Sequence, residues 1–173
     1  MGALPGRGRG VFVEGANRRE QPEGRQHVAE EWLVSLESIR QSYVGGRHGE
    51  GGSELFAVTL LEVERGKTIF RLPITKDVGG GVAGGVHGGV IAALVDIGVV
   101  AAVLSACKLG DQMRGTAELN VSYLRPAIGE ALIATATIIK KGSSLAVGDV
   151  DVHNDQGSLV AKGRATYALG RAR

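Results

Sequence analysis

The sequence predicts an α+β domain in which one antiparallel sheet of about six strands faces a single long helix. The apolar stretch from Gly88 to Lys108 has the length of a helix and lacks a polar face. The chain after it, from Met113 to Leu169, contains four strand-like runs separated only by turns. Because no segment remains for crossover helices, these strands must be antiparallel. The helix needs cover on all sides, so the sheet curls around it, a second subunit packs on it, or both.

Composition limits the classes of function to consider. The chain has 173 residues, of which 43% are hydrophobic and 22% charged, as expected for one domain that folds around its own core. Its single cysteine, Cys107, excludes an internal disulfide and a cysteine-rich zinc site. The formal net charge of +2 gives no electrostatic reason to expect a nucleic-acid partner. We therefore expect no nucleic acid, no metal and no cofactor.

The N-terminal region divides into a tail and a helix. Residues 1–27 have no hydrophobic period and predict a mobile tail, whereas residues 28–173 form the domain. Residues 28–44 predict an amphipathic helix, because apolar side chains recur there at helical spacing. The chain start lacks the apolar run of a secretion signal, and an acid near the middle of a membrane-spanning helix is costly. We expect a cytoplasmic protein that does not enter a membrane.

The domain core is expected over residues 54–169. A hairpin comes first, with strands at 54–64 and 67–74 around a turn that contains Gly66. A glycine-rich loop over 75–86 leads into the long helix, for which Gly110 is the expected C-terminal stop. The four later strands are predicted at Met113–Leu124, Glu130–Lys141, Leu145–Asn154 and Ser158–Leu169. In the first of these, Ala117, Leu119, Val121 and Tyr123 alternate with polar residues.

The glycine loop matches two nucleotide-binding patterns only superficially. Gly79, Gly81 and Gly84 have the spacing G-x-G-x-x-G, but no later helix–strand units follow to build a dinucleotide fold. A phosphate-binding P-loop needs Gly-Lys followed by Ser or Thr, and the chain has Gly-Val-His at this point. Neither class of nucleotide site is predicted.

The start of the long helix is a candidate oxyanion hole. His87, Gly88 and Gly89 stand where the first backbone N–H groups of a helix lack intrahelical partners and lie at the positive end of its dipole. Such groups can bind and polarise a carbonyl oxygen. The alternative is that the two glycines only permit tight packing.

Asp96 is the second candidate. It lies in the middle of the apolar helix, where an ionised carboxylate is disfavoured unless it is paired or hydrogen-bonded. It is therefore either a structural acid bound to a hydroxyl or backbone group, or a general base or nucleophile in a desolvated site. Eight residues, or about 12 Å of helix, separate Asp96 from Gly88, too far for both to act on one bound carbonyl. Two antiparallel helices would solve this, so we predict a symmetric dimer with shared sites.

Several short motifs resemble those of the PaaI-like hotdog-fold acyl-CoA thioesterases. They are His87–Val90, Asp96 with Leu94, Thr116–Ala127 and Gly163–Tyr167, and the resemblance covers about residues 54–169. It implies a hotdog fold, in which a curved antiparallel sheet wraps around the long helix. It also implies hydrolysis of acyl-CoA and a homodimer, or a dimer of such dimers, formed through the strand after the helix.

The resemblance also implies roles for individual residues. The Gly88 N–H would polarise the thioester carbonyl, with Gly89 beside it in the substrate site. Asp96 would attack directly or activate water, and Thr116 would hold that water. His87 would organise the loop or transfer a proton.

The remaining candidate residues depart from the family's pattern or are less specific. Members often carry Asn or Gln where this chain has Gly81, which leaves open a module that binds acyl-CoA without hydrolysing it. A dehydratase on the same fold is a third hypothesis, although the paired His and acid of that chemistry are not recognisable in this sequence. Arg125 and Lys141 are candidate ligands of the CoA phosphates, although basic residues at strand ends are often only solvated.

Overall fold

The computed structural model describes residues 31–43 and 57–171. The predicted tail over 1–27 lies outside the described residues, as do 28–30, 44 and the beginning of the first predicted strand. Within the described part, α1 spans Leu36–Tyr43 and is shorter than the predicted helix. Trp32, ahead of α1, instead forms an isolated antiparallel bridge with Lys108.

Six antiparallel strands form one sheet, as predicted. They are β1 (Thr59–Glu64), β2 (Lys67–Pro73), β3 (Asp111–Tyr123), β4 (Ala131–Lys141), β5 (Leu145–Asn154) and β6 (Leu159–Arg171), in the order β1-β2-β4-β5-β6-β3. Gly66, with φ of +79°, supplies the left-handed residue of the β1–β2 turn. The strand that follows the long helix, β3, is therefore an edge strand of 13 residues.

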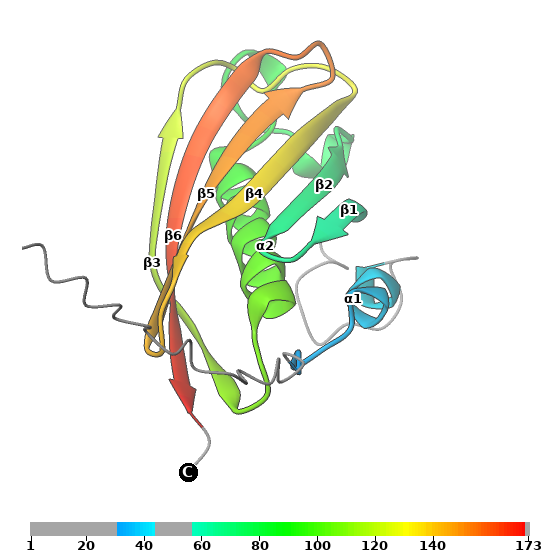
Figure 1. Ribbon diagram of the computed structural model, residues 1–173. Helices are drawn as coiled ribbons and strands as arrows, with labels where there is room; N and C mark the ends of the chain where they lie inside the picture. The colour runs from blue at the N-terminus through cyan, green and yellow to red at the C-terminus, as the bar shows by residue number, and fades with distance from the viewer. Residues whose placement is uncertain (1–30, 44–56, 172–173) are drawn as a thin grey trace, which may run out of the picture.

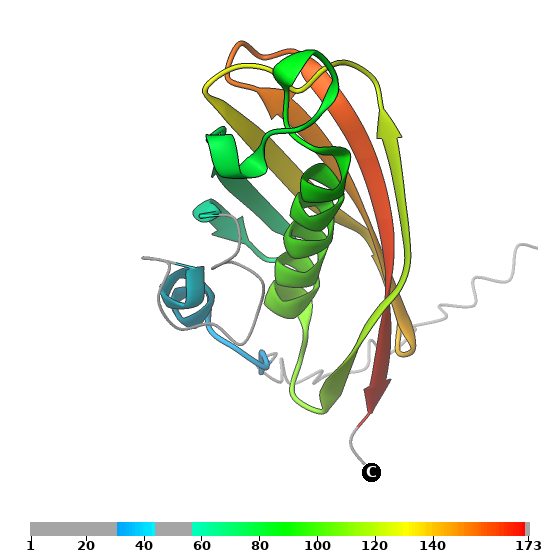
Figure 2. The same ribbon diagram turned by 180° about the vertical axis from the view of Figure 1, so that it is seen from behind.

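The long helix α2 (Gly88–Ala106) lies in the hollow of the curved sheet (Figures 1 and 2). Its sheet-facing side, which includes Leu94, Val95 and Val99, is fully buried against β-strand residues such as Phe70 and Leu132. Gly163 of β6 leaves the space that the Val95 side chain fills. By length and composition α2 could cross a membrane, but half of it is buried in the domain. This arrangement confirms the predicted hotdog fold.

The helix ends slightly earlier than predicted. Cys107 leaves the helical conformation and its carbonyl accepts a hydrogen bond from Leu33 N–H, which draws the chain toward the N-terminal segment. Gly110, with φ of +87°, then supplies the turn into β3 rather than the helix stop. The difference arises because pairing with a distant segment competes with the last helical turn.

The loop between β2 and α2 is held in place by backbone hydrogen bonds. It contains two short 3-10 turns, Lys76–Val78 and Val82–Gly84. His87 N–H donates to Val78 O, and Val86 N–H donates to Ala127 O in the segment that follows β3. The loop is thereby fixed against both the start of α2 and the chain leaving β3.

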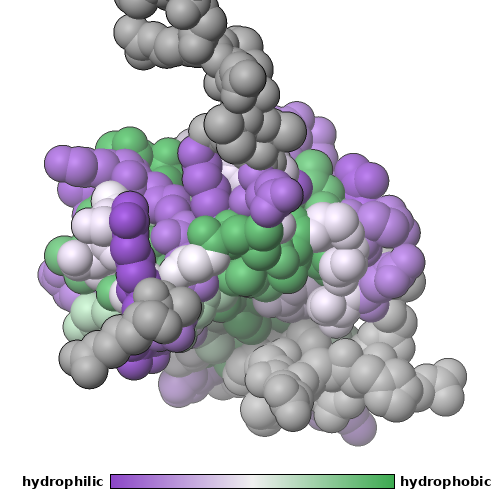
Figure 3. Space-filling model, turned by 60° about the horizontal axis from the view of Figure 1, so that its bottom comes forward, coloured by the Kyte–Doolittle hydropathy of each residue, from purple (hydrophilic) through white to green (hydrophobic). Residues whose placement is uncertain are grey.

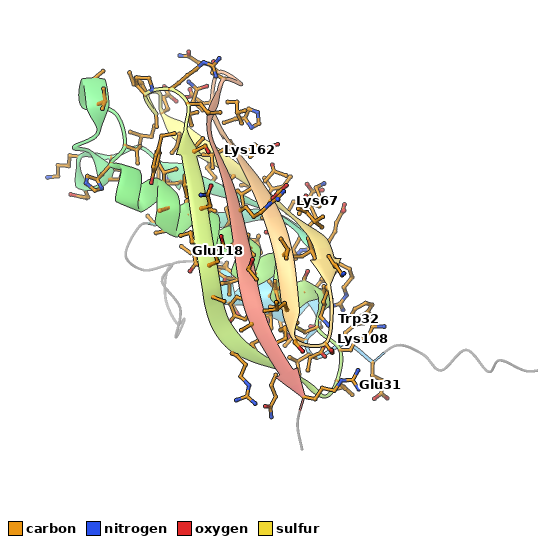
Figure 4. All side chains as sticks on the ribbon, turned by 90° about the vertical axis from the view of Figure 1, so that its left-hand side faces the viewer. Glu31, Trp32, Lys67, Lys108, Glu118 and Lys162 are labelled. Atoms are coloured by element: carbon orange, nitrogen blue, oxygen red, sulfur yellow. The ribbon has the colours of Figure 1, made fainter. Side chains whose placement is uncertain are left out.

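The outer face of the sheet is charged. Arg164 and Lys162 of β6 pair with Asp149 and Asp151 of β5 at 2.6 and 2.5 Å. Figure 4 shows Lys162 and Glu118 on this side, on the two strands nearest the viewer. The apolar residues of β3 therefore face α2, and the charged residues of the neighbouring strands face outward.

Candidate active site

A cavity of about 550 Å³ lies at the N-terminal end of α2. It is formed by the glycine loop, the first turn of α2 and the C-terminal end of β3 with the segment that follows. Four of the predicted site residues line it: Gly81, His87, Gly88 and Arg125. Segments separated by some forty residues in the sequence thus meet at the N-terminal end of α2.

The first turn of α2 presents one free backbone donor. His87 is the N-cap, and its Nδ1 accepts a hydrogen bond of 3.0 Å from Gly89 N–H. Because Nδ1 is the acceptor, the neutral ring carries its proton on Nε2. The N–H groups of Val90 and Ile91 donate to His87 O. Among the described residues, Gly88 N–H is left without an acceptor, at the positive end of the helix dipole.

Tyr123 closes one side of the cavity, and the sequence reasoning did not select it. Its hydroxyl donates a hydrogen bond of 2.9 Å to Gly88 O. Its ring lies against Gly88, where a Cβ would be 3.4 Å from two ring carbons. The alternation in the sequence of β3 places Tyr123 on the apolar face of its strand, but no sequence signal shows which helical turn it meets.

Asp96 and Thr116 form a pair further along α2. Thr116 Oγ1 donates a hydrogen bond of 2.6 Å to Asp96 Oδ1. Asp96 is half-buried rather than fully enclosed in apolar side chains, because it lies on the side of α2 that faces the edge strand β3, where the sheet ends. Burial raises the pKa of the Tyr43 and Tyr167 phenols, and the nearby Asp96 carboxylate raises both further.

Within one chain the Gly88 N–H and the Asp96 carboxylate do not lie close enough to act on one bound carbonyl. Eight residues of helix, or about 12 Å, separate Gly88 from Asp96. The edge strand β3 runs alongside, and its helix-facing side chains Leu119 and Tyr123 are 39% and 54% exposed. A long strand with one edge unpaired and an exposed apolar side is an unusual surface for a monomer.

Gly81 occupies a position with no room for a side chain. Its N–H donates to Gly85 O, and a Cβ there would collide with the carbonyl of Val86. The loop backbone thus fills the space next to the position at which the resemblance implies Asn or Gln. In this loop conformation no amide side chain can extend from residue 81 into the cavity.

The two predicted phosphate ligands lie at opposite ends of the molecule. Arg125 lines the cavity at the start of α2, and its Nη1 donates to Leu159 O at 2.8 Å. Lys141 instead bonds to Asp111 Oδ2 at 2.5 Å, beyond the other end of α2. The structure therefore does not bring Lys141 to the cavity at the start of α2.

Lys141 lies in a second cavity of about 700 Å³, with Trp32 and Arg65. The Arg65 guanidinium stacks on the Trp32 ring at 4.3 Å and donates to Ser105 O at 2.6 Å. Figure 4 shows Trp32 and Lys108 together at this end. Figure 3, in which the bottom of the molecule comes forward, shows an apolar area beside polar residues on that side of the domain. These contacts tie the N-terminal segment to the end of α2.

The described part of the chain contains no cluster of three or more His, Cys, Asp or Glu side chains arranged to hold a metal ion. Cys107 is buried, and burial raises the pKa of its thiol. Its principal neighbours are core residues, so it is not a candidate nucleophile. The chemistry of the site rests on backbone amides, a carboxylate and hydroxyl groups.

Comparison with known proteins gives consistent matches. A sequence profile of the thioesterase superfamily matches residues 83–161. The medium/long-chain acyl-CoA thioesterase YigI of Escherichia coli K12 is 41% identical over 56 residues, 32% of this chain and 36% of YigI. The match thus spans about a third of that relative's length.

Two further matches cover more of the fold. Human acyl-coenzyme A thioesterase 13 is 34% identical over 115 residues, 65% of this chain and 80% of the human protein. The crystal structure of the BH2602 protein of Bacillus halodurans with CoA superimposes with a TM-score of 0.54 at 34% identity. That superposition covers 58% of this chain and 69% of BH2602.

Proposed function

Because the chain belongs to the thioesterase superfamily, we propose that it hydrolyses acyl-CoA thioesters to the free acid and CoA. The observation that carries the proposal is the combination of a Gly88 N–H without an acceptor at the start of α2 and the pair that Asp96, further along α2, forms with Thr116 of β3. Thioester hydrolysis needs a donor for the developing oxyanion and a group that delivers the nucleophile. The named relatives YigI and acyl-coenzyme A thioesterase 13, and the CoA-bound BH2602 structure, support CoA thioesters as the substrate class.

The site is completed by a second subunit. With two copies joined through β3, Gly88 of one subunit lies opposite Asp96 and Thr116 of the other. The length of the β3 edge and its exposed apolar side chains support this homodimer, which pairs with a second dimer if a tetramer forms. The antiparallel arrangement removes the separation of about 12 Å that keeps the two groups apart within one chain.

The chemistry follows from these positions. Gly88 N–H, with Gly89 beside it, binds the thioester oxygen. Asp96 takes a proton from a water held by Thr116, the water oxygen bonds to the acyl carbon, the C–S bond breaks, and the proton passes to the CoA thiolate. In the nucleophilic variant, an Asp96 oxygen bonds to the acyl carbon, the C–S bond breaks and CoA leaves as the thiolate. Water then hydrolyses the resulting anhydride, which releases the free acid, restores the Asp96 carboxylate and supplies the proton that the thiolate takes up.

The remaining predicted residues have supporting roles in this proposal. His87 caps the helix through Nδ1, which favours loop organisation over proton transfer. Arg125 lies at the cavity and keeps further guanidinium donors for a phosphate besides the one bound to Leu159 O. Lys141 contacts substrate only if a partner subunit brings the two ends of the helices together.

The test is hydrolysis of a panel of aliphatic and aromatic acyl-CoAs. Release of the CoA thiol is the quantity that is measured. We expect the wild type to hydrolyse at least one of them and Asp96→Asn to lower kcat by about a hundredfold or more, the range for loss of a general base. Asp77→Asn, which changes an exposed acid on a 3-10 turn, is the matched control and should keep wild-type kcat. A variant at Asp96 as fast as the wild type would exclude this mechanism.

A second candidate is a module that binds acyl-CoA without hydrolysing it. The observation that favours it is Gly81, where the loop backbone leaves no room for an amide side chain. Incubation with acyl-CoA followed by native mass spectrometry separates the two. A stable acyl-CoA complex with no free acid supports the binding module, whereas accumulation of CoA supports the hydrolase.

A further inference from the structure

One peptide group at the start of α2 is held at both ends by side chains. This is the peptide between Gly88 and Gly89. Its N–H donates to His87 Nδ1 at 3.0 Å, and its C=O accepts from Tyr123 Oη at 2.9 Å. His87 comes from the loop before the helix and Tyr123 from the far end of β3, so the peptide is fixed between two separate elements.

We propose that Tyr123 is a positioning residue for the Gly88 amide, a role that rests on the proposed thioesterase function. Two consecutive glycines have wide conformational freedom, and the first turn of a helix lacks the hydrogen bonds that would restrict it. The direction of Gly88 N–H depends on the torsion angles that join it to the next peptide. The peptide that carries the donor is held at its His87 O by the N–H groups of Val90 and Ile91. Fixing the adjoining Gly88–Gly89 peptide removes the remaining freedom in the direction of the donor.

The surroundings of Tyr123 indicate a local function rather than core packing. The residue is 54% exposed and lines the cavity, so its hydroxyl contributes little to the hydrophobic core. Its ring contacts the position of the missing Gly88 Cβ at 3.4 Å, which keeps the ring directly beside the helix start. The hydroxyl and the ring act on the same residue.

A fixed donor matters because an oxyanion hole stabilises charge that develops only in the transition state. A donor that must reorient during the reaction loses part of this benefit. Loss of the Tyr123 hydroxyl should thus slow the chemical step more than it weakens substrate binding.

The test is Tyr123→Phe, which removes one oxygen and keeps the ring. We expect kcat for the best acyl-CoA to fall about three- to tenfold, the effect of one lost hydrogen bond, with KM within about twofold of the wild type. We also expect the hydrogen-exchange rate of the Gly89 amide to become several-fold faster. NMR without substrate measures this rate. Ser122→Ala, the adjacent β3 position on the opposite face, is the control and should change neither quantity.

The outcomes are distinct. Wild-type kcat in Tyr123→Phe overturns the positioning role, whatever the exchange rate, and a rise in KM at unchanged kcat overturns it in favour of substrate binding. If the wild type hydrolyses no acyl-CoA, the proposed function fails. The Gly89 exchange rate then decides by itself whether Tyr123 holds the peptide, and unchanged exchange overturns that as well.

Discussion

Thr116 Oγ1 donates a 2.6 Å hydrogen bond to Asp96 Oδ1, and this bond joins the edge strand β3 to the middle of α2. It depends on a bulge. The register of β3 on β6 shifts between Thr116 and Glu118, so Ala117 is an extra residue in the strand. Thr116 and Leu119, three residues apart, consequently both face the helix, which regular alternation would forbid.

Replacement of Thr116 tests this bond. Thr116→Ala should lower kcat for acyl-CoA hydrolysis about tenfold, because the hydroxyl that orients the carboxylate or its water is lost. Thr116→Ser keeps the hydroxyl and should stay within about threefold of the wild type. Equal rates for the Ala and Ser variants would show that the hydroxyl has no part in catalysis.

The Gly88 N–H can be removed with little distortion. Gly88 is the first residue of α2, a position that tolerates proline, and His87 before it has the extended conformation that proline requires (φ −62°, ψ 136°). Gly88→Pro should lower kcat about a hundredfold, the effect of removing one oxyanion donor. Gly88→Ala keeps the N–H, adds a Cβ at the same place and is the matched control. Comparable rates for the two variants would exclude the donor role.

Mixing two inactive variants tests whether the site is shared. A heterodimer of Asp96→Asn and Gly88→Pro has one site with native Asp96 and native Gly88 only if these come from different subunits. Refolding the two together should then restore about a quarter of wild-type activity, since half of the dimers are mixed and one of their two sites is intact. Mass spectrometry verifies that mixed dimers have formed. If the mixture nevertheless stays inactive, each site belongs to one chain.

Variants of His87 distinguish a capping role from a role in proton transfer. His87→Ala should destabilise the domain by about 1 kcal/mol, because Gly89 N–H loses its acceptor. His87→Asn supplies another capping oxygen and should recover most of the stability in urea unfolding. If His87 only organises the loop, the Asn variant also recovers thioesterase activity. A stable but inactive Asn variant would instead point to proton transfer.

The lowered pKa of the Asp111 carboxyl predicts a contribution to the stability of the fold that is lost in acid. Burial raises the pKa of this carboxyl, but hydrogen bonds from Lys141 and the Lys108 backbone and the charges of Lys141 and Arg171 outweigh burial, and the pKa is lowered from 3.8. The ionised form therefore stabilises the fold above about pH 3.8, and this contribution is lost as pH falls further.

Asp111→Asn should accordingly lower the free energy of unfolding by about 1–3 kcal/mol at pH 7 and flatten its fall below pH 4. Urea unfolding at several pH values measures both. Asp151→Asn breaks the exposed Lys162 pair, whose side chains are 52% and 42% exposed, and should cost less than about 1 kcal/mol. An equal cost for the two variants would contradict the role of burial at Asp111.

Much of the fold could be read from the sequence. The apolar run of α2 and the alternating runs after it specify one helix and antiparallel strands, because burial of the corresponding faces leaves few arrangements. The β5 bounds agree with the prediction, and the other strands differ by one or two residues where they can be compared. The N-terminal helix is shorter because the chain around Trp32 pairs with the end of α2.

The sequence by itself determined the fold class and marked Gly88 and Asp96 as the exceptional residues of an apolar helix, since backbone and hydrophobic periodicity are local properties. Only the tertiary structure decided which side chains meet them. Tyr123 reaches Gly88 from 35 residues away, Thr116 reaches Asp96 through a bulge, and Lys141 is held by Asp111 at the far end. These contacts depend on strand register and on how the sheet curves, which no short window of sequence encodes.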